Sequence, residues 1–285
     1  MIVPSQRYAH KGYRAETTLI TVCHDCGGCA KHGGEMTALF SQTSGSGEPI
    51  LVLLHGVGAT GAVFNRLIEA LRWPGRIVVP DLRGHGRSPH ARHYGMAHHA
   101  ADVAELFEPG TPLHVVGHSM GGAVALVLAN GFYSVKVEKV SAFGVKTDWT
   151  ADELAKGEAF AASPVRWFDT RAAAAERFLK VSGLFGHVGL DDAAADTGIV
   201  AEDGRWRLAA DNATTRAAGT TAAQLAAAAA APFQIFCGGK DPMVNVERMR
   251  AFAPDAFTIG DGGHNPHIEY PQEVAAAIRK FHLGA

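Results

Sequence analysis

The stretch LHVVGHSMGGAVALVLAN, residues 113–130, constrains the fold of this chain more than any other feature. An apolar run of strand character leads into Gly117, and an apolar run of helical character follows Gly121. The turn between them is so sharp that the two backbones come together, which leaves no room for a Cβ on either side of Ser119. We therefore expect Ser119 to project from the carboxyl edge of a sheet, at the N-terminus of a helix.

From residue 50 onward the chain alternates short apolar runs with longer helical segments, which is typical of a parallel sheet with crossover helices. Buried strands are expected at residues 50–56, 76–81, 113–119, 137–143 and 233–239. Helices are expected at residues 62–72, 97–108, 120–130, 244–252 and 273–282. Ahead of them, residues 17–22 and 36–41 suggest an antiparallel hairpin. The predicted fold class is α/β, a mostly parallel central sheet with helices on both faces.

Residues 146–231 interrupt this alternation. They contain aromatic residues among alanine-rich helical stretches and no convincing strand. We predict a helical cap inserted between two core strands, with the α/β core formed by residues 1–145 and 232–285. A second helical layer that only packs on the core is the alternative interpretation.

Composition limits the class of protein. With 47% apolar residues among 285, the chain can bury a sizeable core, and its formal charge of -2 provides no field to gather nucleic acid or an anionic membrane. The first residues lack the apolar core of a signal peptide, and no run approaches the length of a membrane span. We expect a cytoplasmic protein whose partner is a small neutral or weakly charged molecule, with no nucleic acid or membrane partner.

A serine hydroxyl is a poor nucleophile until a base takes its proton and a third group orients that base. Two later loops supply these groups. Asp241 lies in a Gly-x-x-Asp-Pro turn after an apolar run, and His264 follows two glycines after the next apolar run. Ser119, Asp241 and His264, each at the end of a separate strand, stand in the order expected after a G-x-S-x-G turn.

Other polar residues compete for these roles. Asp148, after the fourth buried strand, is the main rival for the acid. His267 lacks the Gly-Gly sequence that precedes His264, and we expect it to pack against the loop or contact substrate. The remaining candidates are assigned to structure or surface: Asp81 and His85 hold the loop DLRGHGRS by hydrogen bonds, and His98 and His99 lie in a surface helix. For Arg166 a solvated side chain is favoured over one that meets a substrate carboxylate.

Five segments spread over most of the chain resemble the motifs of the α/β-hydrolase superfamily. In chain order they are LLHGVGAT, DLRGHGRS, GHSMGG, GGKDPMV and GGHNPHIEYP. The resemblance implies Ser119 as nucleophile, His264 as general base and then acid, and Asp241 as the residue that orients His264. It also implies an oxyanion hole formed by the backbone N–H groups of Val57 and Met120, and no cofactor.

A serine at this turn points to acyl transfer through an acyl-enzyme. The leading expectation is hydrolysis of a small or medium carboxylic ester, with pocket candidates Trp149, Trp167, Phe168 and His267. Lactone hydrolysis, thioester hydrolysis and hydrolytic carbon–carbon cleavage remain open, because each uses the same triad and oxyanion hole. From a different class, a non-catalytic ligand-binding member of the fold is the alternative.

A separate motif, VCHDCGGCAKHGG, places Cys23, Cys26, Cys29 and His32 at a spacing of three residues. These are zinc-ligand types, but structural zinc sites usually join two ligand pairs from separated segments. A glycine-rich hairpin turn is the favoured interpretation, with a local disulfide or a bound metal as alternatives. A zinc enzyme centred here would need an open coordination position and a base nearby.

Overall fold

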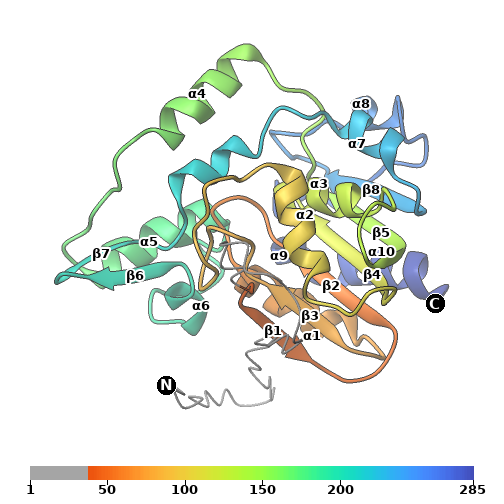
Figure 1. Cartoon of the computed structure of the whole chain (residues 1–285), viewed down its shortest axis with the longest axis horizontal. Coiled ribbons are helices and arrows are strands. Elements are labelled where there is room, and N and C mark those ends of the chain that lie inside the picture. The colour runs from red at the N-terminus through yellow and green to blue at the C-terminus, as the bar shows by residue number, and fades with distance from the viewer. Residues whose placement is uncertain (1–37) are drawn as a thin grey trace, which may run out of the picture.

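The computed structural model describes residues 38–285, and their main element is a seven-stranded sheet with helices on both faces (Figure 1). The strand order is β1-β3-β2-β4-β5-β8-β9, in which β1 pairs antiparallel with β3 and all other pairings are parallel. The strands are β1 Ser41–Ser44, β2 Ile50–Leu54, β3 Ile77–Pro80, β4 Pro112–His118, β5 Lys136–Phe143, β8 Phe233–Gly238 and β9 Phe257–Ile259. The predicted fold class is confirmed.

Each predicted core helix is present, with ends that differ by up to four residues. The core helices are η1 Gly61–Phe64, α1 Asn65–Leu71, α2 Met96–Ala104, α3 Met120–Leu128, α8 Val246–Arg250, α9 Pro266–Glu269 and α10 Pro271–Leu283. On one face α1 and α10 pack on the sheet, and α2 and α3 pack on the other. Among the residues that the structure describes, no helix has the length and apolar character needed to cross a bilayer.

The edge strand β1 corrects one prediction. Its strand pairing begins at Ser41, where the predicted strand 36–41 ends. Phe40 instead bonds to the loop after β3: its N–H donates to Ser88 Oγ at 2.9 Å, and its carbonyl accepts from the Asp81 N–H at 2.9 Å. The predicted partner strand, residues 17–22, lies outside the described residues.

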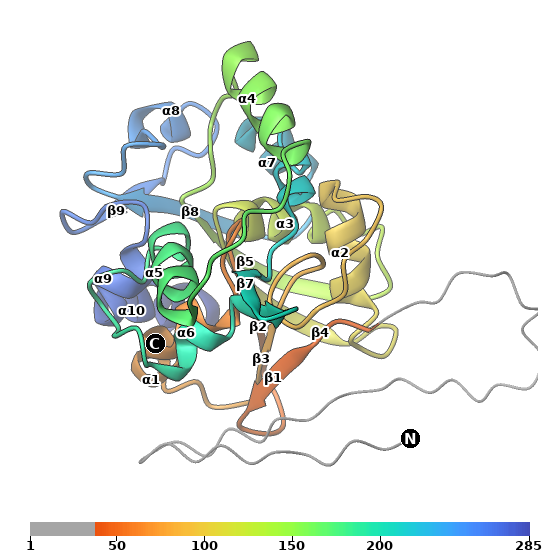
Figure 2. The ribbon, with the colours of Figure 1, turned by 90° about the vertical axis from the view of Figure 1, so that its left-hand side faces the viewer.

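The segment between β5 and β8 contains both helices and a hairpin, so the prediction of no strand within it was wrong. Its antiparallel hairpin turns through Asp203 and Gly204, whose φ values of 49° and 74° suit a two-residue turn. Figures 1 and 2 show α4 set apart from the sheet. The elements are α4 Ala151–Ala161, α5 Arg171–Ser182, α6 Ala193–Asp196, β6 Ile199–Glu202, β7 Arg205–Leu208, η2 Asn212–Arg216 and α7 Ala222–Ala228.

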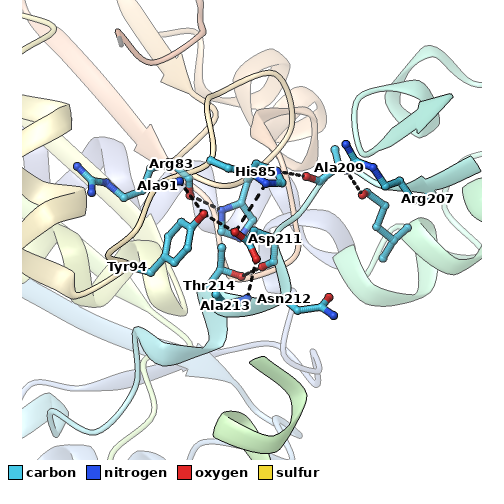
Figure 3. Close-up of polar contacts among 12 residues, drawn as sticks. Arg83, His85, Ala91, Tyr94, Arg207, Ala209, Asp211, Asn212, Ala213 and Thr214 are labelled. Carbon is cyan, nitrogen blue, oxygen red and sulfur yellow. Dashed lines mark hydrogen bonds and ion pairs between the residues drawn. The ribbon is translucent and has the colours of Figure 1, made fainter. Parts of the chain in front are cut away.

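Asp211 ties this inserted segment to the loop after β3 (Figure 3). The Tyr94 hydroxyl donates to Asp211 Oδ2 at 2.6 Å and accepts from the Ala91 N–H at 2.8 Å. The Asp211 N–H donates to the Gly84 carbonyl at 2.8 Å. Burial alone would raise the pKa of Asp211, but hydrogen bonds from Tyr94 and the Ala213 N–H outweigh it and lower this pKa. The carboxylate is thus held charged where the two segments meet.

Tyr94→Phe removes the hydroxyl between Ala91 and Asp211 while keeping the buried ring. We expect the free energy of unfolding, measured with urea, to fall by about 1–3 kcal/mol, because a carboxylate and a backbone N–H both lose a partner. Tyr133→Phe is the matched control, since the Tyr133 hydroxyl makes a single 3.2 Å bond to the Ala97 carbonyl near the surface. Equal losses in the two variants would contradict the role given to Asp211.

Candidate active site

Ser119 sits between β4 and α3 in a strained backbone conformation. Its φ of 53° and ψ of -117° are rare for a residue with a side chain. A Cβ built on Gly117 would lie 2.2 Å from the Gly121 carbonyl oxygen, and one on Gly121 would lie 2.1 Å from that of Leu54. The predicted reason, close approach of the strand and helix backbones of this turn, is therefore confirmed for Gly117, whereas Gly121 has no room for a Cβ because α3 lies against the end of β2. The Ser119 N–H donates to the Phe143 carbonyl at 2.8 Å, which ties the turn to β5.

Asp241 and His264 form a hydrogen-bonded pair at the same edge of the sheet. Asp241 Oδ2 accepts from His264 Nδ1 at 2.9 Å, and its Oδ1 accepts from the Met243 N–H at 2.8 Å. The Asp241 side chain has no exposed surface, whereas that of His264 is 19% exposed. Because the hydrogen of the His264 ring lies on Nδ1, where it is donated in this hydrogen bond to the carboxylate, Nε2 is the basic atom. The rival Asp148 instead pairs with Arg248 at 2.9 Å on the surface.

The topology brings Ser119, Asp241 and His264 together. They follow β4, β8 and β9, whose carboxyl ends share one edge of the sheet. The His264 ring lies against Gly144, since a Cβ there would be 3.3 Å from His264 Cε1, and Gly144 follows the Phe143 carbonyl that holds Ser119. Within residues 38–285, no hydrogen bond joins the Ser119 hydroxyl to His264.

In the loop after β2, two hydrogen bonds to its carbonyl fix the peptide group between Gly56 and Val57. The Gly56 carbonyl accepts from His55 Nδ1 at 2.8 Å and from the Ala59 N–H at 3.2 Å. The C=O and N–H of a trans peptide point in opposite directions, so the Val57 N–H points away from these donors. It donates to no protein group in the described part of the chain, and the same holds for the Met120 N–H.

A second histidine fixes the next peptide group of this loop. The Gly58 N–H donates to His85 Nε2 at 3.0 Å, and His85 Nδ1 donates to the Arg83 carbonyl at 3.0 Å. Asp81 Oδ1 accepts from the Gly61 N–H at 2.8 Å. Asp81 and His85 therefore hold their loop by hydrogen bonds, as the sequence predicts. Burial lowers the pKa of His85 to about 3, which keeps its Nε2 unprotonated and able to accept.

Two histidines lie deeper than the sequence suggests. His267 has no exposed surface and packs against Phe64 and His118, with ring centroids 5.2 and 4.6 Å away. It therefore offers no surface to a substrate, and its assignment to the pocket is corrected. His99 also has no exposed surface, because it lies on the face of α2 that packs on the core, whereas His98 is exposed as predicted.

The three aromatic pocket candidates are half-buried, and each is covered on one face by a cation. The pairs are Lys146 over Trp149 at 5.2 Å, Arg205 over Trp167 at 4.8 Å and Arg166 over Phe168 at 5.0 Å. Arg166 is exposed, as predicted, but it stacks on a ring rather than standing free. Their role in a pocket stays a prediction.

The exposed side chain of Val181 lies against the loop after β2. Near the end of α5, Val181 Cγ1 lies 2.5 Å from a Cβ built on Gly58, and Asn265 Nδ2 lies 2.3 Å from one built on Gly183. The end of α5 therefore covers both the loop after β2 and the loop that carries His264. The other large apolar side chains exposed in the inserted segment, or in the loops after β2 and β8, are Val57, Leu154, Phe160, Val165, Phe185, Leu190 and Met243.

Metal-ligating side chains do not converge in residues 38–285, where no group of three or more His, Cys, Asp and Glu is arranged to hold an ion. The cluster Cys23, Cys26, Cys29 and His32 lies outside the described residues. Its interpretation as a hairpin turn, a disulfide or a metal site stays a prediction.

Comparison with known proteins finds relatives of this chain both by sequence and by structure. A sequence model described as "Alpha/beta hydrolase family" matches residues 51–277. The pimeloyl-[acyl-carrier protein] methyl ester esterase of Chromobacterium violaceum is 30% identical over 263 residues, which cover 84% of this chain and 96% of the esterase. The structure of E-2-(acetamidomethylene)succinate hydrolase superposes with a TM-score of 0.70 at 21% identity, covering 85% of this chain and 95% of the hydrolase.

Other relatives match over a shorter stretch. The magnesium-chelatase 30 kDa subunit of Rhodobacter capsulatus is 44% identical over 92 residues, which cover 31% of this chain and 32% of the subunit. The chain thus spans about a third of the length of this relative, and the match concerns that part alone.

Buried histidines make the stability of this fold depend on pH. Within residues 38–285 the buried histidines are His55, His85, His99, His118, His267 and His282. Burial lowers the pKa of His55 to about 4 and that of His85, His99, His267 and His282 to about 3, from an ordinary value of 6.5. Below pH 6.5 the unfolded chain binds more protons than the fold, so the free energy of unfolding falls with falling pH. Above about pH 7.5 these groups contribute little pH dependence.

His99→Leu tests this dependence at one residue, because neither ring nitrogen of His99 has a hydrogen-bond partner in the described structure. As pH falls from 7.5 to 5, His99 should lower the wild-type free energy of unfolding by about 2 kcal/mol. The leucine variant should lack this part of the decrease. Urea unfolding at the two pH values measures it. His98→Leu, at the exposed neighbour, should keep the wild-type pH dependence. If His99→Leu kept the wild-type pH dependence, the lowered pKa given to buried His99 would be contradicted.

Proposed function

The chain belongs to the α/β-hydrolase family, and we propose that it is a serine hydrolase that cleaves a carboxylic ester or a related acyl bond through Ser119. One observation carries the proposal. The hydrogen-bonded pair of Asp241 and His264 lies at the same sheet edge as a serine held in a strained strand-to-helix turn. This is the set of groups that nucleophilic acyl transfer needs, namely a nucleophile, a base and a group that orients the base.

In the proposed reaction, Ser119 Oγ attacks the substrate carbonyl carbon while His264 Nε2 takes the hydroxyl proton. Asp241 keeps its hydrogen bond to Nδ1 and stabilises the imidazolium that forms. His264 then gives the proton to the leaving oxygen, and an acyl-enzyme remains on Ser119. Water then attacks the acyl carbon while His264 Nε2 takes a proton from it. His264 returns this proton to Ser119 Oγ as the carboxylic acid is released. The contact between Ser119 and His264 forms as substrate binds, since catalytic hydrogen bonds are often long in the free enzyme.

The negative charge of the tetrahedral intermediate is stabilised by backbone groups. The N–H groups of Val57 and Met120 are the proposed donors, and the positive end of α3 lies beside them. Each such donor contributes about 3–4 kcal/mol to the stability of the transition state. His55 and His85 fix the peptide groups on either side of Val57, so its donor is oriented before substrate arrives.

We place the substrate among esters with an apolar group of small or medium size. The apolar side chains exposed at this edge, among them Val57, Val181 and Met243, support an apolar group next to the reacting carbonyl. An ester is favoured over a thioester, a lactone or a carbon–carbon bond, because a relative that matches over 96% of its own length is named as a methyl ester esterase. The other three bonds would be cleaved by the same residues.

Ser119→Ala and Asp241→Asn should each lower kcat/KM on p-nitrophenyl esters by about 10⁴-fold or more, because removal of either group disables the proton transfer. Initial rates on acetyl, butyryl and octanoyl esters measure this. Exposed Ser134→Ala and Asp148→Asn are matched controls and should keep wild-type rates. The function would be refuted if Ser119→Ala kept full turnover, or if a fluorophosphonate failed to label Ser119 in the wild type.

A further inference from the structure

His118, the residue before the nucleophile, makes a contact that the proposed mechanism does not use. Its side chain is buried, and its Nε2 lies 2.8 Å from the backbone carbonyl oxygen of His264. A carbonyl oxygen only accepts hydrogen bonds, so His118 Nε2 is the donor. Burial, together with the neighbouring His267 and His264 rings, lowers the pKa of His118 well below its ordinary value. The ring is therefore neutral, with its hydrogen on Nε2.

The His118 ring also lies between the two sides of the site. Its centroid is 4.8 Å from that of His264, and a Cβ built on Gly144 would touch both rings, at 3.2 Å from His118 Cδ2 and 3.3 Å from His264 Cε1. On the opposite side, a Cβ on Gly56 would lie 3.1 Å from His118 Nδ1. His118 thus contacts the base and also the residue that precedes the proposed oxyanion donor Val57.

The loop that carries His264 needs such an anchor. His264 follows the glycine-rich stretch Gly260–Gly263, which by itself restricts the backbone little. The Lys240 N–H holds the Gly262 carbonyl, and Glu269 accepts from the Gly263 N–H, both at 2.8 Å. Among residues 38–285, only the His118 bond holds the carbonyl of His264 itself.

We propose that His118 is a positioning residue, which fixes the backbone of the general base relative to the nucleophile through its Nε2–H bond to the His264 carbonyl. His118 and Ser119 are consecutive, so the group that anchors the base moves with the nucleophile. His264 is then held at two points, by Asp241 through its side chain and by His118 through its backbone. This inference rests on the proposed serine hydrolase function.

The tautomer of His118 in the wild type gives a first test that does not depend on turnover. We expect nitrogen-15 NMR of histidine-labelled protein, assigned with His118→Gln, to show a neutral ring with hydrogen on Nε2 from pH 8 down to pH 5.5. A ring with hydrogen on Nδ1, or one that becomes charged in this range, would overturn the proposal. This result is independent of whether Ser119→Ala loses activity, so the two proposals can fail separately.

The second test compares two substitutions that differ in the donor. His118→Phe keeps an aromatic ring but loses the donor, and we expect kcat to fall about 10- to 100-fold with KM changed by less than about 2-fold. His118→Gln can donate from a similar position and should recover most of kcat. The reaction of Ser119 with a fluorophosphonate should slow in parallel with kcat.

A purely structural role would give a different pattern. His118→Phe would then lower the melting temperature while the folded enzyme kept the wild-type kcat, and this outcome would overturn the proposal. Equal loss of kcat in the phenylalanine and glutamine variants, with both folded, would also overturn it. If His118→Phe does not fold, a wild-type ring with hydrogen on Nδ1, or an unchanged kcat in a folded His118→Leu, would still overturn the proposal.

Discussion

The left-handed backbone of Ser119 is the constraint on which the centre of this molecule depends. Such a conformation costs about 1–3 kcal/mol and persists only where its surroundings stabilise it. Here the Ser119 N–H bonds to the Phe143 carbonyl, and Gly121 allows α3 to pack directly against the Leu54 carbonyl. The ends of β2, β4 and β5 therefore meet at this turn. Gly56, which precedes Val57, also lies close to this turn, since a Cβ built on it would be 3.2 Å from Ser119 Cβ.

Neutral histidines fix much of the backbone around the Ser119 turn by hydrogen bonds. His55, His85 and His118 each donate a ring N–H to a main-chain carbonyl, and His55 and His85 also accept from a main-chain N–H, that of Leu82 and Gly58 respectively. An imidazole can do both only while it is uncharged, and burial keeps it so. The consequence is a fold that loses stability in acid, because these rings take up protons once they are exposed. Fixed peptide groups at the site and acid sensitivity thus have one cause.

The sequence predicts the core well because its strands are continuous apolar runs, such as ILVLL in β2, each followed by turn residues. The hairpin β6–β7 was missed although Asp203-Gly204 between two β-rich runs is a hairpin motif, since the alanine-rich surroundings outweighed it. The burial of His99 could also be predicted from the sequence, because His99 lies four residues before Val103 and so on the apolar face of α2. No pattern in the sequence, however, predicts that His118 reaches the His264 carbonyl, because this contact depends on how β4 and the loop after β9 pack in three dimensions.

The inserted segment is attached to the core unequally. In α5, Phe178 and Leu179 are buried in the same cluster as the helices α1 and α10. In α4 no residue is buried, and hydrogen bonds such as that from Thr215 Oγ1 to the Gly157 carbonyl join it to η2. Local opening costs least where few apolar contacts are buried, so α4 separates from the core more easily than α5. The end of α5 is therefore held firmly over the loop after β2, whereas α4 is the less firmly held part of the inserted segment.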